Sequence, residues 1–190
     1  MRSKAPSLRH ARQSRSTVIT RPLVQQLSRV LRVRGDRRGA LAEAESALRL
    51  SPNLAFGYGS RCSTLVFSGR PNEGIGDLQT SLRLEPRGRT SAFRLQHIGI
   101  GYYFCRAYED AVEVFAEAIR SFPEVPGTNT WLPAALGQLG RTKEARAALE
   151  QAIAIAPAAF DRNVRQRVPY FRPEDHAHLV EGLLKAGWTG

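Results

Sequence analysis

Apolar and small residues recur at intervals of three and four along most of the chain, which is the spacing of one face of an α-helix. Two such faces follow one another between residues 95 and 123. The first consists of Leu95, Ile98, Gly99 and Tyr102, and the second of Ala111, Phe115 and Ala118. The small residues allow two helices to approach, and Phe115 fills the space between them. This segment therefore predicts an antiparallel helix pair.

One short phrase ends four segments of the chain. It reads ALRLSP, SLRLEP, AIRSFP and AIAIAP, with prolines at Pro52, Pro86, Pro123 and Pro157. These prolines are 34, 37 and 34 residues apart. Proline lacks an N–H group and cannot continue a helix, so each phrase predicts a helix end. A period of ~34 residues is typical of a repeated helix–turn–helix unit.

These residues resemble the tetratricopeptide repeat (TPR) family over residues 22–157. The match is best at Leu95, Ile98, Gly99 and Tyr102 in a first helix and at Ala111, Phe115, Ala118 and Pro123 in a second. The resemblance implies an all-α, right-handed solenoid of antiparallel helix pairs over residues 21–157, with three clear repeats and one partial repeat. It also implies a non-catalytic protein-interaction scaffold.

The other repeats follow the same pattern more loosely. A first helix at about residues 55–67 is expected in the second repeat, and the three extra residues of the third repeat are expected to lengthen its first helix by about one turn. The expected facing stripes are Leu23, Leu27, Val30, Leu31, Ala40, Leu41, Ala44, Ala47 and Leu48; Tyr58, Cys62, Leu65, Ile75, Leu78 and Ser81; and Leu132, Leu136, Leu139, Ala145, Leu149, Ala152 and Ile153.

The tail, residues 158–190, predicts a capping helix near residues 173–186. Its proline–aromatic segment at Pro169 and its Lys185–Ala186–Gly187 ending look like the C-terminal region of bacterial class III adenylate/guanylate cyclases that carry a TPR array. The pattern departs from those enzymes because the catalytic domain, with its two metal-binding aspartates, is absent. The chain is therefore expected to lack cyclase activity, either as an accessory array or as part of a split cyclase.

Charge is concentrated at the beginning of the chain. The net charge is +11, but residues 1–38 hold 11 Lys/Arg and one acid, which leaves about +1 for the remainder. Residues 1–20 are therefore expected to form a disordered basic arm. A solvated tail is favoured, while weak contact with polyanions such as nucleic acid or anionic surfaces, and an organelle transit segment, remain open.

Few residues suggest chemistry. His176 and His178 are two apart and so do not share a helix face, which favours a solvated helix start over a metal site. Gly99 and Gly101 lack the third glycine of a dinucleotide loop. No catalytic residue, metal ligand or cofactor is predicted. Cys62 and Cys105 are expected to be buried, reduced thiols in a cytoplasmic protein, and no apolar run reaches the ~20 residues of a membrane span.

The remaining candidate site is the concave side of the solenoid, which the first helices line. This strip is apolar and aromatic with few charges, and it suits an extended or helical peptide with apolar anchors. The predicted peptide-binding residues are Phe56, Ser63, Val66, Phe93, Gln96, Ile100, Tyr103, Thr130 and Ala134. For Phe93 and Tyr103 a second interpretation remains equally open, namely packing against a neighbouring repeat or the C-terminal helix.

Overall fold

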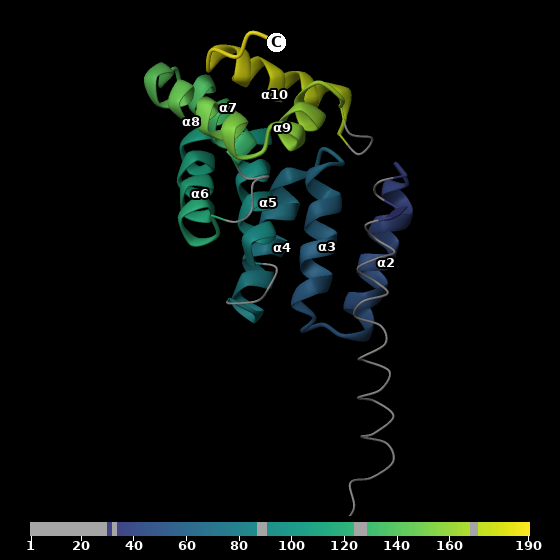
Figure 1. The fold of residues 1–190 in the computed structure, drawn as a ribbon. Helices are drawn as coiled ribbons and strands as arrows, with labels where there is room; N and C mark the ends of the chain where they lie inside the picture. Colours follow the sequence, from purple (N-terminus) through teal and green to yellow (C-terminus); the bar gives the residue numbers. More distant parts are fainter. Residues whose placement is uncertain (1–29, 32–33, 87–90, 124–128, 168–170) are drawn as a thin grey trace, which may run out of the picture.

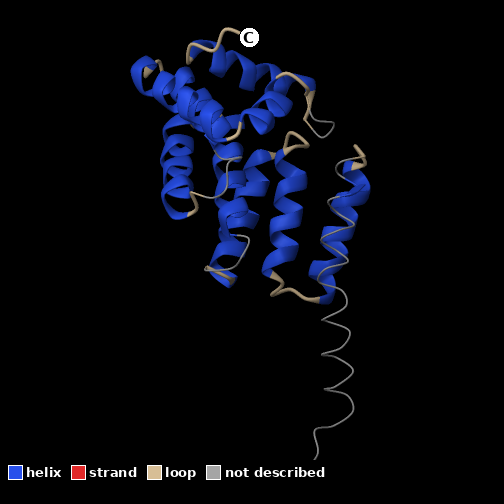
Figure 2. Cartoon of the chain, in the orientation of Figure 1, coloured by secondary structure: helices blue, strands red, loops and turns tan. Residues whose placement is uncertain are grey.

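The computed structural model describes residues 30–31, 34–86, 91–123, 129–167 and 171–190. All regular structure in this part of the chain is helical (Figure 2). The helices are α2 (Arg37–Leu50), α3 (Ala55–Val66), α4 (Pro71–Leu84), α5 (Ser91–Phe104), α6 (Tyr108–Ser121), α7 (Trp131–Gln138), α8 (Thr142–Ile155), α9 (Pro157–Val164) and α10 (Pro173–Lys185). The prediction of an all-α fold is confirmed.

Neighbours in sequence are neighbours in space. Helices α2 to α6 each pack on the next one and stand side by side, and α7 to α10 lie at one end of them (Figure 1). The pairs α3–α4, α5–α6 and α7–α8 are the second, third and fourth repeats, and α2 is the second helix of the first repeat. The chain is therefore an all-α helical solenoid.

Glycine and alanine set how closely the helices of a pair approach. A β-carbon at Gly99 would lie 2.6 Å from Cδ1 of Phe115, so the Phe115 ring occupies the space that a side chain at position 99 would need. Phe115 and Ala111 are fully buried. The predicted register of the third repeat is thus confirmed.

Each pair turns through one residue in the left-handed backbone region. Gly35, Gly69 and Gly140 have φ values of 81°, 82° and 71°, and Arg106 takes the equivalent place with φ 63°. After this residue, a backbone N–H reaches back to a carbonyl of the first helix, as in Arg70 N–H to Leu65 O at 3.0 Å. Glycine suits this conformation because it has no β-carbon, so Arg106 is the strained member of the set.

Several details differ from the sequence-based expectation. Helix α5 has 14 residues against 12 in α3, and residues 87–90 before it lie outside the described part of the chain, so the extra turn stays a prediction. Val30 and Ile153, which were both expected on facing stripes, are exposed. Helix α9 was not predicted; it begins at Pro157, the residue expected only to end α8. Residues 1–20, Leu23 and Leu27 lie outside the described residues.

Candidate functional site

The nine predicted peptide-binding residues lie on the first helices of the pairs, α3, α5 and α7, or at the residue before α7. We call the side that they mark the inner face. Phe93 is 53% exposed, and Phe56 and Gln96 are half-buried. The buried ones are Ser63, Val66, Ile100, Tyr103, Thr130 and Ala134. Among these nine described residues, the exposed or half-buried ones all lie near the beginnings of α3 and α5.

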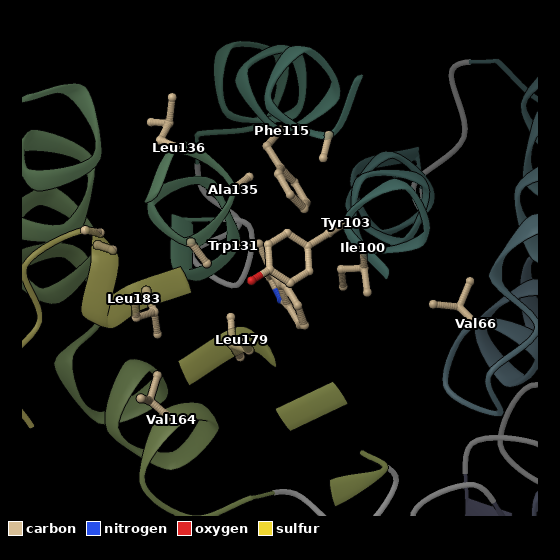
Figure 3. Packing of buried hydrophobic residues seen from close by; sticks show 14 of the residues in the cluster. Val66, Ile100, Tyr103, Phe115, Trp131, Ala135, Leu136, Val164, Leu179 and Leu183 are labelled. Atoms are coloured by element: carbon tan, nitrogen blue, oxygen red, sulfur yellow. The ribbon is translucent and has the colours of Figure 1, made fainter. Parts of the chain in front are cut away.

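The second half of the inner face is covered by the C-terminal segment, Phe171–Ala186. The Tyr103 hydroxyl donates a hydrogen bond to the backbone oxygen of His178 at 2.7 Å, and the two rings stack with centroids 4.5 Å apart. Tyr103 is fully buried, between Phe115, Ile100 and Trp131 in Figure 3. It therefore packs against the C-terminal helix, the second of the two interpretations, and does not line an open surface.

Aromatic rings continue this seam toward the second repeat. Phe171 stacks on Phe67, at the end of α3, with centroids 5.0 Å apart, and lies 5.7 Å from Trp131. The guanidinium of Arg172 covers Gly69, where a β-carbon would lie 2.7 Å from its Cζ atom. The segment therefore contacts the second, third and fourth repeats, although it follows the fourth in sequence.

Helix α10 approaches α7 at two glycines. A β-carbon at Gly182 would lie 2.6 Å from the Tyr103 hydroxyl oxygen and 2.7 Å from the Ala134 carbonyl oxygen. A β-carbon at Gly137 would lie 2.9 Å from the Ala186 nitrogen. Ordinary non-bonded carbon contacts are about 3.5–4.0 Å long, so glycine is required at both crossing points.

The histidines of α10 are not a solvated helix start, which corrects the sequence-based expectation. His178 Nε2 lies 2.8 Å from the Tyr108 hydroxyl, and His176 Nε2 lies 2.9 Å from the Val164 carbonyl oxygen, to which it donates. Burial, followed by the charge of Arg106, lowers the pKa of His178 below its ordinary value. The neutral imidazole is therefore favoured at this interface.

Histidine also borders the open part of the inner face. His97 Nδ1 lies 2.6 Å from the Phe93 carbonyl oxygen, and because a carbonyl only accepts, Nδ1 carries the proton. In the neutral ring Nε2 then accepts a hydrogen bond from the Ser63 hydroxyl, 3.2 Å away. His97 thus links α5 to α3 beside Phe93. We call Phe56, Phe93, Gln96 and His97 the open strip.

A polar notch of ≈ 300 Å³ lies between α2, α3 and α4. Arg61 forms two hydrogen bonds of 2.6 Å to the carboxylate of Asp77 in its wall, and Arg70 is bonded to Glu73 in the same way. Both arginines already have a carboxylate partner, so the notch does not suggest an anion site.

The described residues give no support to a reactive or metal centre. Within them, no three His, Cys, Asp or Glu side chains converge on a point where a metal ion could be held. Cys62 is buried and Cys105 is half-buried, and both are thiols, so the expectation of burial is wrong for Cys105. In this part of the chain no helix combines the length and apolarity that crossing a bilayer requires.

The sequence missed Phe67, Trp131, Phe171 and His178 as parts of the inner face. None of them lies on a predicted facing stripe. The one available signal is the proline–aromatic segment before α10, which resembles a family feature and does not by itself indicate a contact. Their positions follow from long-range packing, which periodicity does not report.

No protein-family model matches the chain. Among solved structures, the crystal structure of MamA is 20% identical with a TM-score of 0.59, and the match covers 84% of this chain and 92% of that chain. A MamA "41-end" fragment from Desulfovibrio magneticus RS-1 is 17% identical with a TM-score of 0.61, covering 88% and 93%. YrrB, described as a TPR protein with an unusual peptide-binding site, is 18% identical with a TM-score of 0.57, covering 86% and 82%. These likenesses show that the fold is a TPR-type solenoid.

Proposed function

We propose that the chain is a protein-interaction scaffold that binds an apolar peptide segment along the open strip. The observation that carries this proposal is the exposed aromatic ring of Phe93, which stands on a helix whose other large apolar side chains are buried or half-buried. The fold supports it, because TPR-type arrays present the first helices of their pairs to partners. The peptide-binding site of YrrB is an analogy in the same direction.

The spacing of the aromatic rings suggests which apolar residues of a peptide they bind. Phe56 is the second residue of α3 and Phe93 is the third residue of α5. Each lies 30 residues before the proline that follows the second helix of its pair, Pro86 or Pro123, so the two rings hold equivalent places in successive repeats. Packed helices lie about 8–10 Å apart. An extended chain advances roughly 3.3 Å per residue. Two apolar anchors separated by one or two residues would therefore reach both rings.

The polar members of the open strip suit a peptide backbone. Gln96 offers both a donor and an acceptor, and none of the four residues carries a carboxylate or an ammonium group. A neutral, partly apolar segment therefore suits the strip better than a highly charged one.

Selection from a randomised 12-residue peptide library displayed on phage tests this proposal. The full chain is expected to select peptides with two apolar residues separated by one or two positions. Phe93→Ser is expected to weaken their binding at least tenfold. Leu184→Ser is the matched control, because Leu184 on α10 is also 53% exposed but lies off the strip. Equal losses in the two variants would contradict the proposal.

The basic beginning of the chain supports an alternative, contact with polyanions. The observation behind this alternative is the concentration of 11 Lys/Arg in residues 1–38. Selection of acidic peptides whose binding falls steeply with salt and disappears on removal of residues 1–20 would favour this alternative over the open strip.

We further propose that the chain itself is not an enzyme. The likeness to cyclase arrays stays a prediction, because the solved structures above share only the fold. Cyclic-nucleotide formation from ATP or GTP with Mg²⁺ or Mn²⁺ is expected to stay at background, and activity that co-purifies with the chain would overturn this view.

A further inference from the structure

The C-terminal segment Phe171–Ala186 rests on the array much as a bound helix would. Leu179 and Leu183 are fully buried in the cluster that contains the Tyr103 ring and the buried side chains of α7 (Figure 3). Leu184, the next residue of α10, is 53% exposed. The helix is therefore amphipathic, and one side of it fits the inner face. The fit of α10 involves only the covered half of the inner face, so it is independent of whether the open strip binds a peptide.

The surface under α10, formed by Tyr103, Trp131, Ala134 and Gly137, has the features of a helix-binding site. Ala134 and Gly137 on α7 allow a second helix to come close, and Tyr103 provides a hydroxyl that a helix backbone oxygen accepts from. Trp131 supplies an aromatic wall. A helix that fits must carry a small residue at the crossing point, where α10 has Gly182, and apolar residues beside it.

The interface between α10 and this surface also buries polar atoms, which costs them their hydration. The Gln138 side-chain nitrogen is buried with no hydrogen-bond acceptor among the described residues. Half-buried His178 has a lowered pKa because burial and Arg106 disfavour its charged form. Both groups would regain water on release of α10, which partly offsets the loss of its apolar contacts.

We propose that the surface formed by Tyr103, Trp131, Ala134 and Gly137 is a binding site for an amphipathic helix of a partner protein, and that α10 is its built-in, releasable occupant. The partner helix carries a glycine or alanine at the crossing point. Because α10 occupies the site, a partner binds only to the fraction of molecules in which α10 has been released.

Hydrogen exchange on the wild-type full chain tests the release. The amides of α10 are expected to exchange as a group and at least tenfold faster than those of α5 and α6. Equal rates in the three helices would show that α10 opens only with global unfolding, and would overturn the proposal.

Binding of a helix in trans tests the site. The probe is a fluorescent synthetic peptide of residues 171–190, added to full-length Gly182→Val, in which the side chain displaces the chain's own α10. Gly76→Val is the matched control, because a β-carbon at this helical glycine meets no atom within 4 Å. The peptide is expected to bind Gly182→Val at least tenfold more tightly than wild type or Gly76→Val.

The outcome of peptide binding, together with the oligomeric state of the chain, identifies what occupies the site. Equal binding by all three proteins would overturn the proposal, and so would binding of a peptide that itself carries Gly182→Val. Wild-type chain is expected to be monomeric by light scattering. A dimer would assign the site to a second copy of the chain rather than to a partner protein. If Gly182→Val fails to fold, the exchange rates of the wild-type chain decide.

Discussion

Replacing Gly99 by alanine is expected to destabilise the third repeat, although alanine is the better helix former. A β-carbon at this position would lie 2.6 Å from Cδ1 and 2.8 Å from Cζ of Phe115. Normal carbon contacts are about 3.5–4.0 Å, and the fully buried ring has no room to move away. Such overpacking costs about 1–3 kcal/mol, while the change from glycine to alanine within a helix contributes about 1 kcal/mol in the other direction.

Gly76→Ala provides the comparison, since Gly76 lies in α4 and a β-carbon there meets no atom within 4 Å. This variant gains helix stability without a clash, so the two free energies of unfolding should differ by about 1–3 kcal/mol. Urea denaturation with linear extrapolation measures both. Adding Phe115→Leu to Gly99→Ala is expected to recover part of the loss, because it removes the clashing ring. If Gly99→Ala stabilises the chain as much as Gly76→Ala does, the assigned packing of α5 on α6 is wrong.

Four further changes test other parts of the structure. Phe115→Ala is expected to cost about 3–5 kcal/mol in urea denaturation, because it leaves a cavity between α5 and α6; a loss below 1 kcal/mol would refute its burial. Arg106→Gly is expected to raise stability by up to about 1 kcal/mol in the same assay, because glycine relieves the left-handed backbone; a loss would argue against strain there. The free energy of unfolding is expected to reach its maximum above pH about 6.5 and to fall below that pH. The reason is that the lowered pKa of His178 makes the folded state bind a proton on this imidazole less readily than the unfolded state does. His178→Gln should reduce this dependence in pH-dependent melts, and an unchanged profile would exclude His178 as its source. Arg94→Met is expected to cost about 1–3 kcal/mol by removing the buried bond to the Glu85 carbonyl, whereas exposed Arg120→Met should change stability by less than about 0.5 kcal/mol; equal effects would contradict this.

Local pattern was sufficient for the helix pairs. The alternation of small and large residues at positions 111, 115 and 118 predicted both the helix and its buried side, and the prolines predicted the helix ends. The first helix of the second repeat was expected at about residues 55–67 and is observed at Ala55–Val66. Such features depend on contacts within one repeat, so the sequence reports them directly.

The covered half of the inner face could not be predicted in the same way. The bond from Tyr103 to His178 joins residues 75 positions apart, and no periodicity connects them. An apolar strip on a first helix has the same sequence pattern whether a partner or the chain's own tail covers it. The sequence therefore shows that Val66, Ile100 and Ala134 form an apolar strip, but it does not show whether this strip is exposed or covered.

The measurement that tests the central claim most directly is a hydrogen-exchange footprint on the full chain with and without the tightest peptide from the phage library. Peptide binding to the open strip predicts slower exchange at the beginnings of α3 and α5, around Phe56, Phe93 and His97, with α4, α6 and α8 unchanged. Protection confined to α4, α6 or α8, the second helices of the pairs, would contradict the assignment of the inner face as the peptide-binding surface.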